Sequence, residues 1–222
     1  GRTIPDIQDV KLSAADKWIV SRLESCVKEV TLNLQKFELG IAAGILYDFM
    51  WSDFCDWYIE LCKSALYGDD EAKKSATLGV LCFVLENALK LLHPYIPYIT
   101  EEIYQNLPNV SGSIMVSEFP RYNSKLAYKK EAKAFERVME VIRVVRNMKA
   151  SVGCPAAKKV KLFVSTSNKA YVNANATSIL KLAGASEIVF CDNGACIGEK
   201  TVSQVTELCT VYIAVSYTHL TL

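Results

Sequence analysis

The stretch from Ile45 to Tyr67, ILYDFMWSDFCDWYIELCKSALY, most constrains what this chain can fold into. Its apolar side chains recur every three or four residues, which is the spacing of a helix, and the run is too long and too dense for a strand. Charged residues interrupt it from Asp48 to Lys63 and exclude a membrane-spanning helix. We therefore expect a helix that is buried on most of its circumference and surrounded by other helices, because large aromatic side chains need partners on several sides.

Four helices are expected in the first half of the chain. Ser13 is a suitable N-cap for the first, and Asp16 lies where a carboxylate favours the positive end of a helix. Asp69 or Asp70 caps the third helix, which ends before Pro94. The expected ranges are 13–37, 38–67, 70–93 and 97–107. Brief turns between long helices predict an antiparallel all-α bundle.

A basic helix and a small α+β region are expected in the second half. Residues 122–152 have helical spacing. The inward seam of this helix is formed by Phe135, Val138, Ile142, Val145 and Met148. Residues 168–183 fit a small helix closed by Gly184. The ranges expected for strands are 160–164, 187–191 and 202–215. The fold class is therefore mainly α, with a helical bundle followed by a small α+β junction domain.

The chain is expected to divide into four parts. These are a lead-in segment at 1–12, the helical bundle at 13–120, the basic helix with the small α+β domain at 121–215, and a tail at 216–222. The tail, SYTHLTL, continues neither the charge pattern nor the period of what precedes it. It resembles a translated sequencing adapter, and we interpret it as an artefact.

Positive charge is concentrated in one block, although the net charge of the chain is only +1. Residues 121–161 hold twelve Lys and Arg against three Asp and Glu, a net +9, whereas residues 1–120 hold ten against seventeen, a net −7. The block lies mostly on the predicted helix 122–152 and at its exit. A basic stretch beside an acidic body suits a polyanionic partner; a lysine-rich solvated helix face is the alternative.

No arrangement of residues for catalysis or metal binding is recognisable. The eight cysteines form no C-x-x-C pair, and half of them fall among apolar residues of predicted helices, which indicates buried reduced thiols rather than disulfides. The two histidines, His93 and His219, have no partners at zinc-ligand spacing. His93 is expected to cap a carbonyl at a helix end. We predict no catalytic residue and no metal site.

The beginning of the chain lacks the basic, apolar and small-residue order of a signal peptide. About half of the residues are apolar and about a quarter are charged, as in ordinary globular proteins. We therefore expect a cytoplasmic, monomeric protein with no membrane partner.

Five segments together resemble the C-terminal half of the valyl-tRNA synthetase family. They are ADKWIVSRL at 15–23, ILYDFMWSDFCDWYIELCKSAL at 45–66, LKLLHPYIPYITEEIYQNLP at 89–108, SIMVSEFP at 113–120 and RVVRNMKASVGCPAAKKVKLFV at 143–164. The resemblance covers about residues 3 to 215. WSDFCDWYIEL and KLLHPYIPYITEE are its most specific parts, since isoleucyl- and leucyl-tRNA synthetases share the architecture but usually lack the FCDWY run.

The resemblance implies a piece of a class I valine-tRNA ligase whose helical bundle receives the anticodon arm of a valine tRNA. The family's nucleotide-binding domain, with its His-Ile-Gly-His-type and Lys-Met-Ser-Lys-Ser-type signatures, is not in this sequence. ATP and Mg²⁺ would bind that catalytic domain, so no cofactor is expected here and the fragment alone should not make aminoacyl-adenylate. The family's first bundle helix would lie upstream of Gly1, and its loss would expose an apolar groove.

The resemblance also suggests which residues contact RNA. Trp18 would stack on a base of the anticodon loop, Arg22 would pair with a base edge or a phosphate, and Leu85 would touch an anticodon base. For Trp18 and Leu85 the alternative is a role in the core. The phosphate contacts expected at the end of the basic helix and in the following strand are Arg143, Arg146, Lys149, Lys158 and Lys159.

Three other hypotheses remain open at this point. The chain could be the anticodon-binding part of an isoleucyl- or leucyl-tRNA synthetase. It could be a helical protein-interaction module whose basic helix meets an acidic protein. It could also be an independent enzyme that uses cysteine chemistry, which has the least support in the sequence.

Overall fold

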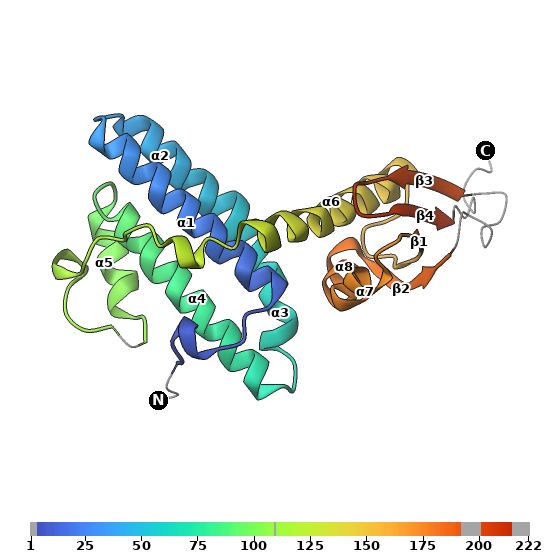
Figure 1. The fold of residues 1–222 in the computed structure, drawn as a ribbon, viewed down its shortest axis with the longest axis horizontal. Coiled ribbons are helices and arrows are strands. Elements are labelled where there is room, and N and C mark those ends of the chain that lie inside the picture. Colours follow the sequence, from blue (N-terminus) through green and yellow to red (C-terminus); the bar gives the residue numbers. More distant parts are fainter. Residues whose placement is uncertain (1–3, 109, 192–200, 215–222) are drawn as a thin grey trace. The chain divides into compact units, whose positions relative to one another are not determined.

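The computed structural model describes residues 4–108, 110–191 and 201–214. They form a mainly helical protein with one small sheet and divide into two compact units, Gly1–Lys133 and Ala134–Leu222 (Figure 1). The predicted fold class is confirmed, because a helical bundle precedes a small α+β region. The tail predicted at 216–222 lies outside the described residues.

Helix α1 (Ala14–Gln35) organises the first unit. The Ser13 hydroxyl accepts the Asp16 N–H at 3.2 Å, and the Asp16 carboxylate accepts the Ser13 N–H at 2.8 Å. This reciprocal capping box confirms Ser13 as the N-cap. The Asp16 carboxylate also accepts the Tyr58 hydroxyl at 2.6 Å in a buried position. Asp16 therefore begins α1 and ties it to the next helix.

The aromatic stretch forms one continuous helical rod with a widened middle. Helices α2 (Leu39–Asp48) and α3 (Glu60–Leu66) flank a π-helix, η2 (Phe49–Ile59). The buried residues of η2 are Phe49, Phe54 and Tyr58, which are five and four positions apart. A π-helix closes its hydrogen bonds one residue later than an α-helix, so this wider spacing keeps the three rings on one side.

The prediction that this rod is buried on most of its circumference is wrong. Tyr47 is 63% exposed and Trp51 is 56% exposed. At Gly40 and Gly44, no atom other than the backbone of the same helix lies within 4 Å of the position that a Cβ would take. The rod buries one face against α1 and α4, and no element of the described residues lies over the opposite face.

Helix α4 (Glu71–Leu92) runs through the bundle between α1, α3 and α5 (Pro97–Gln105). Asp70 caps α4 by accepting the Lys73 N–H at 3.1 Å. The 3-10 turn η1 (Ile7–Asp9) packs on α4, where the Pro5 carbonyl is so close that a Cβ on Gly79 would be 2.8 Å from it. Within the described part of the lead-in segment, Pro5 and η1 therefore pack against the bundle.

By length and composition, α4 is the one described helix that could cross a bilayer, but here it is a packed helix of the bundle.

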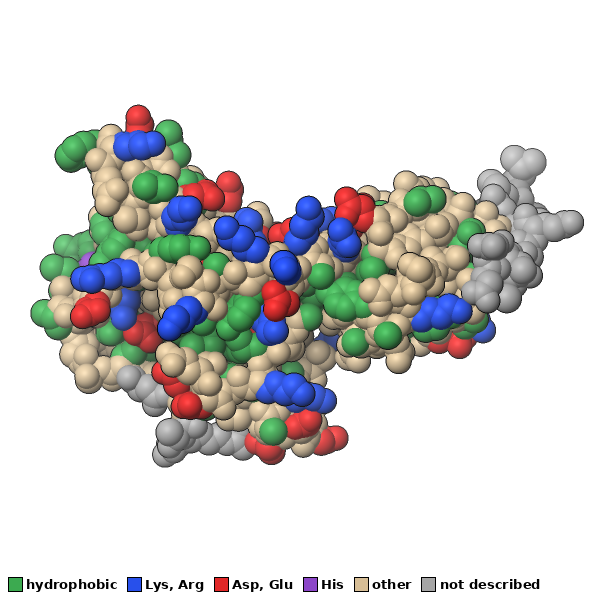
Figure 2. Space-filling view, viewed as in Figure 1, with side chains coloured by type: hydrophobic (Ala, Val, Ile, Leu, Met, Phe, Trp, Pro, Cys, Tyr) green, Lys and Arg blue, Asp and Glu red, His purple; other side chains and the backbone are tan. Residues whose placement is uncertain are grey.

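The end of the bundle near α5 keeps a largely apolar surface, as Figure 2 shows on one face. Tyr98 is 90% exposed, and Met115 in the 3-10 turn η3 (Ile114–Val116) is 72% exposed. Beneath this surface Ile114 packs with Leu89 and Tyr104 in a small buried cluster.

The segment after η3 returns to α1. The Asn123 N–H donates to the Glu24 carboxylate at 2.6 Å, and the turn η4 (Ser124–Leu126) packs on α1. Burial raises the pKa of Glu24, and the bond from Asn123 opposes that shift. Because this segment packs on α1, the two units divide at Lys133 within α6 (Lys129–Ser151), whereas the division predicted from the sequence lies at 120/121.

The second unit combines α6 with a four-stranded mixed sheet in the order β2-β1-β4-β3. The strands are β1 (Val160–Ser165), β2 (Ala185–Phe190), β3 (Thr201–Val205) and β4 (Thr210–Ala214). Strands β1 and β2 are parallel, and the other pairs are antiparallel. Helices α7 (Lys169–Ala174) and α8 (Ala176–Ala183) join β1 to β2, and Gly184 ends α8 in the left-handed conformation, as predicted. Every residue of the predicted α6 seam is buried.

We predict that Tyr58→Phe lowers the free energy of unfolding of the first unit by about 1–3 kcal/mol, because the buried Asp16 carboxylate loses a hydroxyl donor. Urea unfolding followed by tryptophan fluorescence measures this, since all three tryptophans, Trp18, Trp51 and Trp57, lie in that unit. Tyr98→Phe is the matched control at a ring that is 90% exposed. Equal stability of the two variants would show that the bond between Tyr58 and Asp16 contributes nothing.

Candidate nucleic-acid interface

The residues predicted to read the anticodon from α1 separate in the structure. Trp18 is only 1% exposed, so neither face of its ring is available to a base, and its burial supports the alternative role in the core. Arg22, one turn later, has a side chain that is 45% exposed and donates to the Asp53 carboxylate at 2.7 Å. The two residues lie one turn apart on the same helix, but only Arg22 is exposed. Arg22 remains a candidate for RNA contact, held in position by η2.

Leu85 also belongs to the core of the bundle. It packs against the buried cluster of Leu89, Tyr104 and Ile114 and is only partly accessible. This packing supports the alternative role in the core rather than contact with an anticodon base.

Lys149 was predicted as a phosphate contact, but the structure contradicts this prediction. Its side chain is 4% exposed, and its ammonium group donates to the carbonyls of Ala156 at 3.2 Å and Gly184 at 3.1 Å. A Cβ on Gly184 would be 2.6 Å from the Lys149 Nζ. Lys149 therefore joins the end of α6 to the end of α8. Helical periodicity could not reveal this role, because it depends on a left-handed glycine 35 residues away.

The other four predicted phosphate contacts lie at the surface of the second unit. Arg143 and Arg146 are exposed on α6, and Lys158 and Lys159 are exposed in the turn before β1. The Arg146 Nε donates to the Leu182 carbonyl at 2.7 Å, so this side chain also has a structural contact. Their positions on α6 and on the turn that follows it are compatible with a basic surface for a phosphate backbone.

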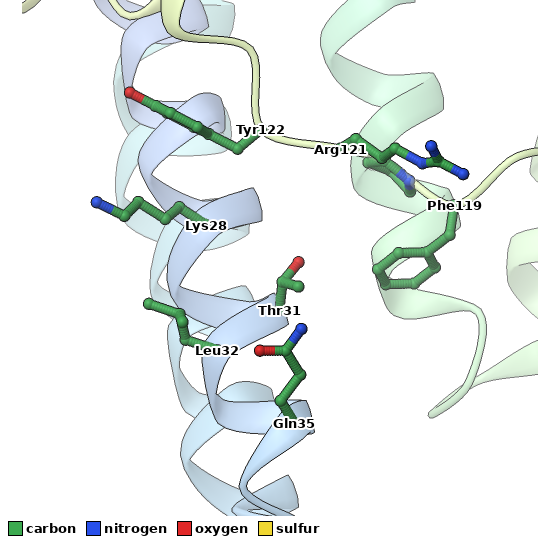
Figure 3. A pocket seen from close by; sticks show the side chains of 8 residues that line it. Lys28, Thr31, Leu32, Gln35, Phe119, Arg121 and Tyr122 are labelled. Atoms are coloured by element: carbon green, nitrogen blue, oxygen red, sulfur yellow. The ribbon is translucent and has the colours of Figure 1, made fainter.

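The first unit contains a groove that was not predicted from the sequence (Figure 3). Its volume is about 300 Å³, and its walls are α1 and the segment that returns from η3. The lining residues are Lys28, Thr31, Leu32, Gln35, Phe119, Pro120, Arg121 and Tyr122. The sequence signal for it was the short run EFPRYN, where aromatic and basic residues alternate around a proline. Tyr122 and Asn123 were predicted to begin the helix 122–152, but α6 begins only at Lys129, so the run lies on the returning segment instead.

The cysteines of the described residues are free thiols, and four of them are buried: Cys26, Cys62, Cys191 and Cys209. Burial raises the pKa of Cys26 to about 12, with smaller contributions from nearby carboxylates. Burial likewise raises the pKa of Cys62 to about 12. A nucleophilic cysteine requires a lowered pKa, so these two thiols are unsuited to catalysis.

His93 links α4 to α5 and does not cap a carbonyl through its side chain. Its Nδ1 lies 2.8 Å from the Thr100 hydroxyl, and its Nε2 faces the Met115 sulfur. Within residues 4–108, 110–191 and 201–214, no cluster of three or more histidine, cysteine and acidic side chains could hold a metal ion.

A helical bundle followed by a basic helix and a small mixed sheet is the arrangement expected for a tRNA-binding piece of an aminoacyl-tRNA synthetase. The chain belongs to the family described as the anticodon-binding domain of tRNA ligase, whose model matches residues 16–164. Its relatives carry a more specific name than the family does.

Those relatives are valine–tRNA ligases. The protein of Clostridium acetobutylicum is 45% identical over 88% of this chain, and that of Clostridium tetani is 42% identical over 90%. The protein of Geobacillus stearothermophilus is 43% identical over 71% of the chain. The resemblance inferred from the sequence motifs is confirmed. The chain spans only 22% of the Clostridium acetobutylicum protein, 23% of the Clostridium tetani protein and 18% of the Geobacillus stearothermophilus protein.

We predict that Lys149→Gln destabilises the second unit by about 1–3 kcal/mol, because two carbonyls lose a charged donor inside the fold. Hydrogen exchange of β1 and β2 should accelerate accordingly. Lys181→Gln, at an exposed lysine on α8 of the same unit, is the control and should leave exchange unchanged. Identical exchange in both variants would show that the bonds of Lys149 to Ala156 and Gly184 do not stabilise the second unit.

We predict that Cys26 and Cys62 resist alkylation in the native protein. A pKa near 12 leaves their thiolate fraction at about pH 8 roughly a thousandfold below that of an ordinary thiol. Their thiols stay protonated in the fold but ionise when the chain unfolds, so stability should fall as pH rises above about 9. Iodoacetamide labelling read by mass spectrometry, with the partly exposed Cys154 as the internal reference, measures the reactivity. Labelling of Cys26 and Cys62 as fast as in urea would contradict the prediction.

Proposed function

We propose that this chain binds the anticodon arm of a valine tRNA as part of a longer, cytoplasmic valine–tRNA ligase that acts as a monomer. The observation that carries the proposal is the match of an anticodon-binding family model over residues 16–164, together with the valine–tRNA ligases that resemble the chain over most of its length. ATP and Mg²⁺ would bind the catalytic part of that ligase, and this chain would supply recognition.

The exposed cations of the second unit support binding to the tRNA backbone. Arg143, Lys158 and Lys159 are exposed near the exit of α6 and in the next turn, where Lys and Arg side chains can meet phosphates. Phosphate contacts fix the position of an RNA, and stacking or hydrogen bonds to unpaired bases give selectivity. Among the residues predicted to touch a base, Arg22 on the first unit is the one whose exposure still allows contact with a base edge or a phosphate.

The exposed apolar face of the rod favours a second candidate function, as a protein-interaction module. Tyr47 and Trp51 are more than half exposed on one side of α2 and η2, beside Gly40 and Gly44. An apolar surface of this kind is typical of protein contacts. The two functions differ in one measurable property, since binding to RNA phosphates weakens steeply with salt and an apolar protein contact does not.

We predict that the variant Arg143→Gln, Lys158→Gln and Lys159→Gln weakens binding to a valine tRNA transcript. Fluorescence anisotropy at several salt concentrations should show the slope of log K against log salt reduced by about 1 for each phosphate that the variant no longer neutralises. Lys73→Gln with Lys74→Gln is the control, because these lysines pair with Asp70 and Glu71 on α4. An unchanged slope in the triple variant would move the phosphate contacts elsewhere. No tRNA binding by the parent chain would overturn the proposed function.

A further inference from the structure

The groove between α1 and residues 119–122 has two walls that are held in place without a ligand. Glu24 on α1 is 4% exposed and accepts the Asn123 N–H at 2.6 Å, directly after the groove-lining segment. Pro120 restricts the backbone of that segment, and η4 packs on α1 just beyond it. A groove with fixed walls binds a ligand at a smaller cost in conformational entropy.

The lining combines flat apolar surfaces with a few polar groups. Phe119 is 40% exposed, Tyr122 is 41% exposed and Leu32 is 45% exposed, so each presents part of its surface to a ligand. Figure 3 shows Thr31, Leu32 and Gln35 along α1, with Phe119 and Arg121 on the separate segment of chain. The Gln35 side chain is exposed and carries both a donor and an acceptor, and the Thr31 hydroxyl, which donates to Val27, can still accept.

Two cations complete the groove. The Lys28 ammonium lies 5.7 Å from the centre of the Tyr122 ring. Figure 3 shows these two side chains on one side of the groove and the exposed Arg121, two residues after Phe119, on the other side. No carboxylate is among the lining residues; Glu29 and Glu118 are neighbours in sequence, and the buried Glu24 is bonded to the backbone of Asn123. The groove therefore offers aromatic surface, amide and hydroxyl groups, and positive charge within about 300 Å³.

We propose that this groove binds one unpaired nucleotide of the RNA, with its base against Phe119 and its phosphate beside Arg121. Aromatic rings recognise unpaired bases by stacking, and Lys and Arg neutralise the adjoining backbone. The volume is at the low end of ligand sites, which suits a single nucleotide rather than a helix of a partner protein. This inference rests on the proposed function and assigns part of it to residues that the sequence motifs did not indicate.

The test compares two fluorescent RNAs, an anticodon stem-loop with an open loop and a fully paired duplex of the same length. Phe119→Leu should weaken stem-loop binding by about 5- to 100-fold, because stacking is removed while apolar volume is retained. Duplex binding should not change. Tyr98→Leu is the matched control, at an exposed ring near α5. Melting temperatures of both variants must equal that of the parent chain within the error of the measurement.

A second readout locates the contact directly. Iodouridine placed in the open loop should form photo-crosslinks to the peptide that contains Phe119, and Arg121→Gln should lower the salt slope by about 1. If Phe119→Leu lowers the melting temperature, the crosslink formed by the unsubstituted chain decides whether the loop contacts this groove. The inference would be overturned if the chain binds the stem-loop, the crosslinks lie elsewhere and the variants bind as tightly as the original chain. That result would leave the proposed function intact. No binding of either RNA by the parent chain would overturn the proposed function as well.

Discussion

The first unit depends on how two buried carboxylates of α1 are satisfied. Asp16 is 5% exposed and Glu24 is 4% exposed, and a buried carboxylate is costly unless hydrogen bonds compensate it. Asp16 accepts the Tyr58 hydroxyl from 42 residues away, and Glu24 accepts the Asn123 N–H from 99 residues away. Both carboxylates belong to α1, so this helix is joined by one bond to the aromatic rod and by the other to the returning segment. The bond from Asn123 to Glu24 also holds the segment that lines the groove, because Asn123 directly follows the lining residues.

The cations of the basic block at residues 121–161 have different partners in the structure, although the block is one feature of the sequence. Lys149 is engaged inside the second unit by two carbonyls, and Arg146 bonds a third at Leu182. Arg137 pairs with Glu207 at 3.0 Å, and Lys161 pairs with Glu187 at 2.8 Å. Four of the twelve cations of this block therefore have partners within the second unit. Net charge per segment measures how many cations are present, whereas burial and partners decide which of them can meet phosphate.

What the sequence predicted well was local. Ser13 could be identified as a cap, the α6 seam as buried and Gly184 as the end of a small helix, because each depends on neighbours a few positions away. The π-helix was not predicted, since its spacing of five competes with the α-helical spacing in a stretch where most residues are apolar. Trp18 and Lys149 could not be placed either. The family match indicated their helices, but which way each side chain faces is set by tertiary packing.

The groove and the basic exit of α6 would make different contributions to one RNA complex. Contacts to phosphate are nearly independent of base identity and weaken with salt, whereas stacking in a groove tolerates salt and requires an unpaired base. A chain with only the first kind of contact would bind any structured RNA, and one with only the second would bind any flexible single strand. An anticodon arm carries a paired stem and an open loop together. If the groove and the exposed cations near the exit of α6 bind RNA as proposed, their combination would give selectivity for such an arm without a base-specific hydrogen bond.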